Sequence, residues 1–358
     1  MNQHPATIAR ANRLGRLAAF AATAALLAIA GRASAAPTET GFHLTGEAQV
    51  GGEGSWDYLQ YDPIHRRLFV ARIGGVEVFD TTDMKPVGTI PAYAGTRVHG
   101  VALAPRRGIG VTSEGADSAA TVFDPATLKV LRRVHLRHAP DAILLDDGSG
   151  KAVAFGEDDP VAMAFDPVTG SGTAEIELPG SPESPVSDGK GAIYVDLSDK
   201  GEIVRIDTRS WKVESHWAIG GGCDEPTPMA IDRRQGRIFV GCRSGVLAIV
   251  DIAGKSLIAS LPIAAGADSV VFDPGSGLVF VSCNAGVLAI FREATPNAYV
   301  LVQNVPTAPG ARTMAFDAEQ LRAFLPVADK GPMLPKVGDI PPRPAIVPET
   351  FRILTVSK

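Results

Sequence analysis

Seven positions at intervals of 41 to 44 residues along this 358-residue chain hold six ionisable residues. The seven positions of this series hold Asp57, His99, Asp141, Glu183, Thr227, Asp268 and Arg312. If the fold brings them together, four carboxylates converge and repel one another, which favours a compensating positive charge. His99, Arg312, a bound cation or a cationic ligand could each supply it. The series therefore predicts a polar binding site, although residues in such positions also cap turns or bond a neighbouring backbone.

Two members of the series carry distinct chemistry. His99, in the stretch RVHGVAL, could act as a general base that Asp57 or Asp141 orients, or it could be a structural histidine. Arg312, in GARTMAF, could bind a carboxylate or phosphate through two parallel hydrogen bonds. The alternative for Arg312 is a salt bridge with Asp57 or Asp268.

Four residues outside the series are further candidates for the site. Trp56, in GSWDYLQYDP, is expected to form an aromatic wall beside the first carboxylate of the series. Glu225, in CDEPTP, lies two residues before the threonine of the series, so it either supplies the charge that the threonine lacks or faces solvent. Arg72 and Glu114 follow the first two turns and form either an outer shell of the site or ordinary surface charges.

A repeat accounts for the spacing. Each position lies five residues before the residue that leads a short polar turn after an apolar run. The stretches that contain these runs and turns are DYLQYDP, GVALAPR, AILLDDG, SPVSDGK, PMAIDRR, SVVFDPG and TMAFDAE. Further β-rich runs follow, such as RRLFVAR, VEVFD and PVGTIP in the first repeat. Four short strands in a period of about 42 residues are typical of β-propeller blades. We therefore predict an all-β, seven-bladed β-propeller with four-stranded antiparallel blades.

This fold would gather the series into one site. The innermost strands of a propeller surround a central channel, and the series lies where these strands begin. The seven side chains should therefore form a ring at one mouth of the channel. The Trp-Asp pair at positions 56 and 57 begins an innermost strand, whereas the signature of WD repeats ends a third strand, so the pair is not that signature.

The last repeat contains only three strand-like runs, TMAFD, LRAFLPVA and FRILTVSK. The segment 42–52, FHLTGEAQVGG, matches the fourth-strand pattern and precedes the first repeat. We predict that it pairs with the last blade, because this closes the ring and removes two exposed sheet edges. Within that blade the Pro-rich loop 329–349 is expected to lack regular pairing and to form either a lid over the mouth or filler on the rim.

A family resemblance supports the same fold. The stretches LFVARIGGVEVFDTTDMKPVGTIP and IFVGCRSGVLAIVDIAGKSLIASLPI resemble the repeats of YVTN, or YncE-like, β-propellers of exported bacterial proteins. The resemblance covers most of the chain after residue 35 and implies a propeller in an exported protein. It does not imply one activity, because lactonases, lyases and quinoprotein dehydrogenases use similar architectures.

The N-terminus predicts export. Arg10, Arg13 and Arg16 precede an apolar run at 17–31, and an A-x-A site at 33–35 follows, as in a Sec signal peptide cleaved after Ala35. The expected product is a single domain, 36–358, in the periplasm or outside the cell. The alternative, an uncleaved membrane anchor, would need a longer apolar run. We therefore expect no membrane span once the signal is removed.

Charge and cysteine content narrow the partners. Removal of residues 1–35 leaves 30 basic and 39 acidic residues, a net charge of −9, which argues against nucleic acid and anionic membrane surfaces. Three cysteines are present, and none forms a CxxC pair. We predict a Cys223–Cys242 disulfide, because both residues should lie on the mouth side of the fifth blade, where the bond would pin the loop that carries Glu225. Cys283 should be a free, buried thiol.

The sequence contains no nucleophile elbow, phosphate loop, HExxH or EF-hand motif, and no pattern for haem or pyrroloquinoline quinone. We therefore predict a monomeric, non-catalytic protein that binds a small molecule, a metal or a protein partner at the charged mouth. A divalent cation is the candidate cofactor. The alternative function is a metal-assisted, lactonase-like hydrolase or lyase, with His99 as base and a carboxylate-bound divalent cation as electrophile.

Overall fold

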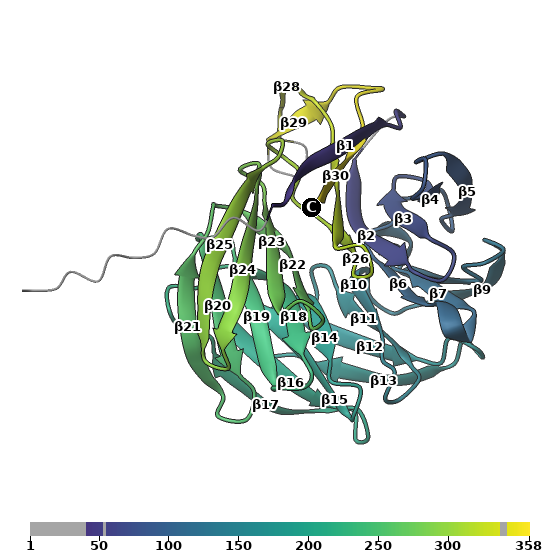
Figure 1. Cartoon of the computed structure of the whole chain (residues 1–358). Helices are drawn as coiled ribbons and strands as arrows, with labels where there is room; N and C mark the ends of the chain where they lie inside the picture. Colours follow the sequence, from purple (N-terminus) through teal and green to yellow (C-terminus); the bar gives the residue numbers. More distant parts are fainter. Residues whose placement is uncertain (1–40, 53–54, 337–341) are drawn as a thin grey trace, which may run out of the picture. The chain divides into compact units, whose positions relative to one another are not determined.

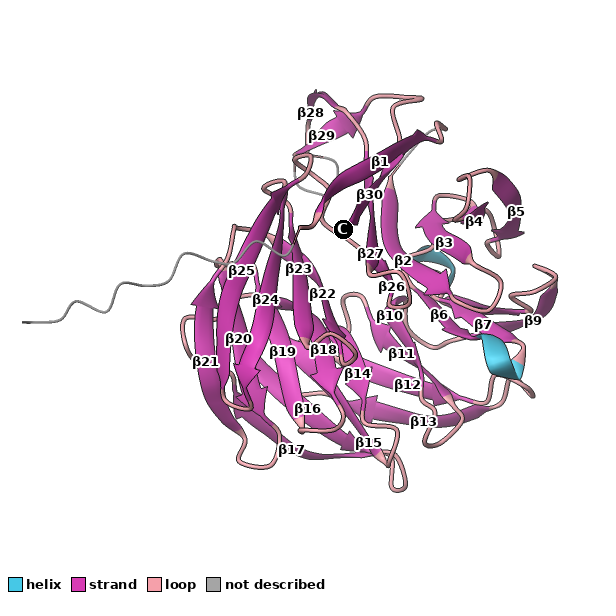
Figure 2. Cartoon of the chain, viewed as in Figure 1, coloured by secondary structure: helices cyan, strands magenta, loops and turns pink. Residues whose placement is uncertain are grey.

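A computed structural model describes residues 41–52, 55–336 and 342–358; the predicted signal peptide lies outside them. Within this part of the chain, seven four-stranded antiparallel sheets form a ring, as predicted (Figures 1 and 2). The helices described are two single turns, η1 (Pro105–Arg107) and η2 (Gly115–Asp117). No helix in the described residues is long and apolar enough to cross a membrane.

The first strand of each blade lines the channel, and the fourth lies outermost. Blade one comprises β2 (Trp56–Asp62), β3 (Arg67–Arg72), β4 (Gly75–Asp80) and β5 (Pro86–Pro91). Blade two comprises β6 (Val101–Ala104), β7 (Ile109–Thr112), β8 (Ala119–Phe123) and β9 (Val130–His135). Blade three comprises β10 (Pro140–Leu145), β11 (Ala152–Gly156), β12 (Val161–Phe165) and β13 (Gly172–Glu177).

The next three blades repeat this order. Blade four comprises β14 (Pro182–Ser187), β15 (Ala192–Leu197), β16 (Glu202–Asp207) and β17 (Lys212–Ala218). Blade five comprises β18 (Pro226–Asp232), β19 (Arg237–Cys242), β20 (Val246–Asp251) and β21 (Ser256–Pro262). Blade six comprises β22 (Ala267–Asp273), β23 (Leu278–Cys283), β24 (Val287–Thr295) and β25 (Ala298–Pro306).

Blade seven joins the two ends of the described chain, which confirms the predicted closure. It contains β26 (Ala315–Asp317), β27 (Arg322–Val327), β30 (Arg352–Ser357) and, outermost, β1 (His43–Gln49). Strand β1 runs antiparallel to β30, with Glu47 opposite Leu354, and Figure 1 shows the two side by side. Phe42, just before β1, packs edge-on against Phe280 of blade six with ring centroids 5.4 Å apart. The closure therefore also ties the last blade to its neighbour.

Aspartates at strand ends form the turns on the side of the ring away from the mouth. Asp62 ends β2 and accepts the backbone N–H of Ile64 at 2.9 Å. Asp166 follows β12 and accepts the N–H of Val168 at 2.8 Å. Such Asx turns stabilise a tight reversal without help from distant residues. This explains why an apolar run ending in Asp recurs in the sequence.

Apolar side chains from adjacent blades form the core. Second and third strands are buried on both faces, which accounts for their continuous apolar runs. Phe69 of blade one stacks on Phe123 of blade two with centroids 5.8 Å apart, and Phe239 of blade five stacks on Phe272 of blade six at 5.0 Å. Burial of one such ring contributes roughly 1.5–3 kcal/mol. The core therefore fixes how each blade sits against the next.

The prediction for the Pro-rich segment is wrong in one respect. Its ends pair as an antiparallel hairpin of β28 (Lys330–Leu334) and β29 (Arg343–Ile346), whereas no regular pairing was expected. The register shifts between Lys330 and Met333, around Pro332, and a two-stranded sheet has only edge strands, where proline is tolerated. Ile346 packs on the cluster that contains Trp56 and Phe351, so the base of the hairpin lies on the rim of blade seven.

The predicted disulfide is present. Cys223 and Cys242 are bonded, with Cα atoms 5.3 Å apart. The bond joins the segment before β18 to the end of β19, within blade five. Cys283 is free and buried, also as predicted, and burial raises the pKa of its thiol to about 12. At neutral pH this thiol is protonated and a poor nucleophile.

Candidate functional site at the channel mouth

Five residues of the series lie at irregularities in the innermost strands. In these blades the pairing of the first strand with the second shifts register across the series position, at Asp57, Asp141, Glu183, Thr227 and Asp268. Such irregularities change the direction of a side chain and are common beside functional sites. His99 lies two residues before β6, and Arg312 lies three residues before β26. We call these seven residues the mouth ring.

Hydroxyl groups of the preceding blade hold the backbone of the mouth ring. The Ser113 hydroxyl donates to the carbonyl of Asp141, and the Ser282 hydroxyl donates to the carbonyl of Arg312. Thr313 donates to the carbonyl of Asp57 at 3.1 Å, across the closure between blades seven and one. These bonds cross between blades, so the core packing that positions the blades also positions the ring side chains.

His99 lies between two carboxylates of the ring. Its Nδ1 is 3.1 Å from Oδ2 of Asp57 and 2.9 Å from Oδ1 of Asp141. His99 is 6% exposed and Asp57 is 8% exposed, so water screens these contacts weakly. Arg97 donates to Oδ2 of Asp57 at 2.8 Å, and Glu157 approaches the other imidazole nitrogen at 3.8 Å. We call Asp57, His99 and Asp141 the triad.

The carboxylates decide the protonation of His99. Burial by itself lowers the pKa of the imidazole, but the hydrogen bonds and charges of Asp141 and Asp57 outweigh burial and raise the pKa to about 9. At neutral pH the ring is therefore an imidazolium that neutralises part of the negative charge. An imidazolium cannot accept a proton, so His99 in this state is not a general base.

The opposite side of the mouth contains an ion pair. Arg312 donates to Oδ2 of Asp268 at 2.6 Å, which is one of the two partners predicted for it. Burial lowers the pKa of Arg312, whereas the charges of Asp268 and then Asp57 raise it, and the net shift is upward. Burial raises the pKa of Asp268 despite the opposing charge of Arg312. Burial therefore acts on both partners of this ion pair.

Glu183 lies between these two groups and carries a perturbed pKa. Burial, and next the charge of Asp141, raise the pKa of Glu183 to about 7, while Arg243 opposes the shift. Glu183 therefore exists in both protonation states near neutral pH. It is the carboxyl group of the mouth ring best suited to exchange a proton there.

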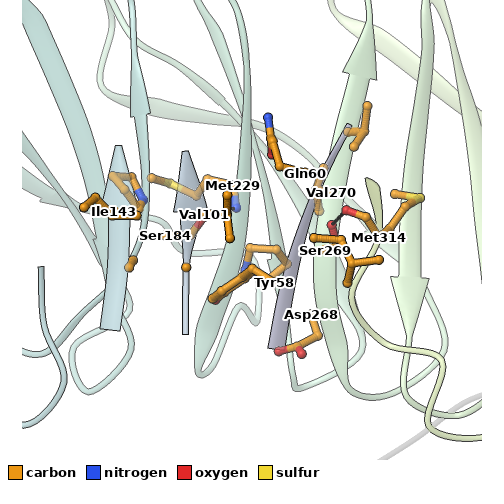
Figure 3. A pocket seen from close by; sticks show the side chains of 16 residues that line it. Tyr58, Gln60, Val101, Ile143, Ser184, Met229, Asp268, Ser269, Val270 and Met314 are labelled. Carbon is orange, nitrogen blue, oxygen red and sulfur yellow. Dashed lines mark hydrogen bonds between the residues drawn. The ribbon is translucent and has the colours of Figure 1, made fainter. Parts of the chain in front are cut away.

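Tyr58 stands at the centre of the mouth. Burial and then the charges of Asp141, Asp268, Asp57 and Glu183 raise the pKa of its hydroxyl well above the ordinary value. The charges of four ring carboxylates therefore act on one phenol. Below the ring lies a cavity of about 210 Å³, lined by residues of all seven blades. Figure 3 shows the Tyr58 ring in the middle of this lining, with Asp268 below it in that view.

Several predicted residues lie away from this cluster. Trp56 is 7% exposed and packs on Phe351 at 5.2 Å, in the core between blades one and seven. Glu225 is exposed and borders a different hollow, of about 530 Å³, beside the disulfide. Thr227 is buried, and its hydroxyl donates to the carbonyl of Glu225 at 3.3 Å. Ligand contacts by Trp56 and Glu225 stay predictions.

Arg72 and Glu114 are buried rather than surface charges. Arg72 is 2% exposed, pairs with Glu77 at 3.0 Å and stacks over the ring of Phe351 at 4.0 Å. Glu114 is fully buried and accepts a hydrogen bond from the Thr112 hydroxyl at 2.8 Å. Both residues therefore support the loops around the mouth, and a surface role for either is wrong.

Sequence reasoning missed four residues of the mouth: Tyr58, Arg97, Glu157 and Arg243. Tyr58 follows the first ring residue directly, and the register shift there brings a second side chain to the channel. Arg97 lies two residues before His99, and Glu157 follows β11. The sequence did contain a signal for Glu157, because this residue directly follows a second strand and all second strands end on the mouth side. No periodic signal marks Arg97.

The triad has the composition of a metal site. One donor atom from each of Asp57, His99 and Asp141 lies within 4.8 Å of the other two. Imidazole nitrogen and carboxylate oxygen together suit Zn²⁺ and Mn²⁺ better than Ca²⁺, which prefers oxygen donors. A bound divalent cation would take the place of the His99 proton and compensate the two carboxylates.

Comparisons with known proteins do not extend this description. No model of a known protein family matches the chain, and no curated protein matches it either.

Proposed function

We propose that this protein binds a divalent cation at the triad and acts as a non-catalytic binding protein. The observation that carries this proposal is the convergence of three donor atoms within 4.8 Å at the channel mouth. The two carboxylates beside His99 Nδ1 support it, because both approach the same nitrogen, at 3.1 and 2.9 Å. Cation and proton would compete for this position.

We further infer that the protein is an exported, divergent relative of the YVTN propellers. The repeat stretches quoted above support the relationship, and the disulfide supports an oxidising compartment. The arginine-led apolar segment at 1–35 supports export by a signal peptide. Sequencing of the N-terminus of the exported protein tests this inference, and a mature chain that still contains residues 1–35 would refute it.

Calorimetric titration of chelator-treated protein with Zn²⁺, Mn²⁺ and Ca²⁺ tests the cation site. We expect one site that prefers Zn²⁺ or Mn²⁺, and we expect Asp141→Asn or His99→Gln to weaken binding by about tenfold or more. His138→Gln is the matched control, because His138 also contacts two carboxylates, Asp159 at 2.7 Å and Glu175 at 3.7 Å, but lies on the surface. Absence of cation binding, or an equal loss in the control, would contradict the proposal.

A hydrolase or lyase at the same mouth is the second candidate. The observation in its favour is the pKa of about 7 at Glu183, which suits a group that accepts and returns protons at neutral pH. In such an enzyme Glu183 would replace His99 as the base. Turnover of simple lactones by wild type and its loss in Glu183→Gln would support this candidate, and no turnover by the cation-loaded protein would contradict it.

A further inference from the structure

The channel cavity directly below the mouth ring is mostly uncharged. Its wall contains the apolar side chains Val101, Ile143, Met229, Val270 and Met314 (Figure 3). Gln60, Ser184 and Ser269 add neutral polar groups. Among the described residues that line the cavity, Asp268 is the sole charged one, and it is paired with Arg312. The cavity therefore suits an uncharged group that enters through a charged mouth.

Two guanidinium groups at this mouth have N–H donors that form no hydrogen bond with the described residues. A guanidinium has five N–H donors. Within the described residues, the side chain of Arg312 donates one hydrogen bond, to Asp268, and it is 34% exposed. Arg243 is exposed and forms no ion pair with any described residue, yet its charge acts on both Glu183 and Asp268. Both can therefore bind an anionic group of a ligand.

A cation at the triad would itself require a further ligand. The triad supplies three protein donors, whereas zinc sites have four ligands and those with three protein donors take the fourth from water or substrate. A divalent cation at the triad also adds positive charge to the mouth. An anion is therefore attracted more strongly to the cation-loaded mouth than to the cation-free one.

We propose that the cation-loaded mouth binds a small monocarboxylic acid, whose carboxylate contacts the cation and Arg312 while its uncharged tail occupies the channel cavity. This inference rests on the proposed function, because the cation is one of the two groups that hold the acid. The space for the tail is the cavity volume of about 210 Å³. Among the described residues, the cavity wall contains no cationic side chain, so it disfavours a second carboxylate.

The probe for this proposal is pentanoate, with pentanamide as the uncharged ligand of the same shape and succinate as the dicarboxylate. Titrations with each are made into cation-free and Zn²⁺-loaded protein. We expect pentanoate to bind the loaded form about tenfold more tightly than the cation-free form, and Zn²⁺ affinity to rise by the same factor when pentanoate is present. Pentanamide and succinate should bind at least about tenfold more weakly than pentanoate.

The double variant Arg312→Gln with Asp268→Asn tests the arginine. It removes both partners of the ion pair, so neither buried charge is left uncompensated and the net charge is unchanged. We expect Zn²⁺ affinity close to wild type and pentanoate affinity lower by about tenfold. Arg106→Gln, at the opposite end of the innermost strand of blade two, is the control and should change neither affinity.

The outcomes separate the two proposals. Zn²⁺ binding without any preference for pentanoate over pentanamide would overturn the acid site and leave the cation site standing. Equal pentanoate affinity of cation-free and loaded protein, or an unchanged affinity in the double variant, would also overturn it. Absence of Zn²⁺ binding would overturn the proposed function and this inference together.

Discussion

Nδ1 of His99 lies 2.9 Å from Oδ1 of Asp141, in a mouth where both side chains are largely removed from water. Because the Asp57 carboxylate is also 3.1 Å from this nitrogen, the imidazolium holds two like charges together. Removal of the proton, the histidine or either carboxylate therefore changes the net charge of the triad. This has consequences for stability as well as for binding.

The first prediction concerns stability as a function of pH. The pKa of His99 is about 9 in the folded protein, against 6.5 for an unperturbed histidine. A raised pKa contributes stability that is complete below pH 6.5 and is lost as pH rises through 9. The shift corresponds to about 3 kcal/mol.

Thermal unfolding of wild type and His99→Gln, each free of cations, measures this contribution. The wild type should be the more stable protein at about pH 6, and the difference should shrink steadily toward about pH 10. The exposed-site control His138→Gln should follow the wild type throughout. A difference that stays constant with pH would mean that His99 contributes by packing alone.

Ionised Glu183 should destabilise the fold, whereas protonated His99 stabilises it. Burial and then the charge of Asp141 raise the pKa of Glu183 to about 7, so the stability present below pH 4.5 is lost as pH rises through 7. Glu183→Gln cannot ionise and avoids this loss. We expect the variant to gain on the order of 1–2 kcal/mol relative to wild type between about pH 4 and pH 8. Glu319→Gln, an exposed substitution, should gain nothing, and an equal gain there would contradict the assignment.

Asp196 should be a neutral acid. It is fully buried in β15, its Oδ1 accepts the N–H of Ser184 at 2.7 Å, and its Oδ2 has no hydrogen-bond partner in the described part of the chain. Burial, and to a smaller extent the charge of Glu183, raise the pKa of this carboxyl well above its ordinary value. The protonated carboxyl therefore contributes stability that is present below the unfolded-state pKa of Asp196 and is lost as the pH rises.

Two substitutions at this position separate its roles. Asp196→Asn keeps an acceptor for Ser184 and cannot ionise, so its stability relative to wild type should increase with pH. Asp196→Ala leaves the N–H of Ser184 unpaired and should cost about 1–3 kcal/mol at low pH. Chemical unfolding at several pH values measures both. Equal and pH-independent effects of the two variants would show that Asp196 is ionised or solvated.

The disulfide should stabilise the mouth side of blade five. Cys223 and Cys242 are 19 residues apart, and a bond that closes a loop of this length contributes about 3 kcal/mol to the free energy of unfolding. We expect a double Cys→Ser variant to lose about that amount. Thiol counting in denaturant without reductant should find one reactive thiol, that of Cys283. Three reactive thiols in the exported protein would contradict the pairing.

The sequence alone predicts most of the fold. Apolar runs that end in Asp set the period, and short-range Asx turns such as that of Asp62 form wherever the run occurs. The closure by 42–52 follows from counting, because the last repeat lacked one strand. The disulfide follows from blade geometry, because both cysteines should lie on the mouth side of the fifth blade. Each of these inferences needs only local pattern and blade geometry.

The tertiary structure alone decides how the mouth works. The series locates the ring residues, but it does not show that His99 pairs with two carboxylates or that Arg312 selects Asp268. Those pairs depend on register shifts and on the hydrogen bonds between blades, which turn side chains by amounts that no repeat spacing records. Arg97 and Tyr58 enter the site for the same reason. The repeat spacing in the sequence determines the seven residues of the mouth ring, and distance and burial in three dimensions determine which charges compensate one another.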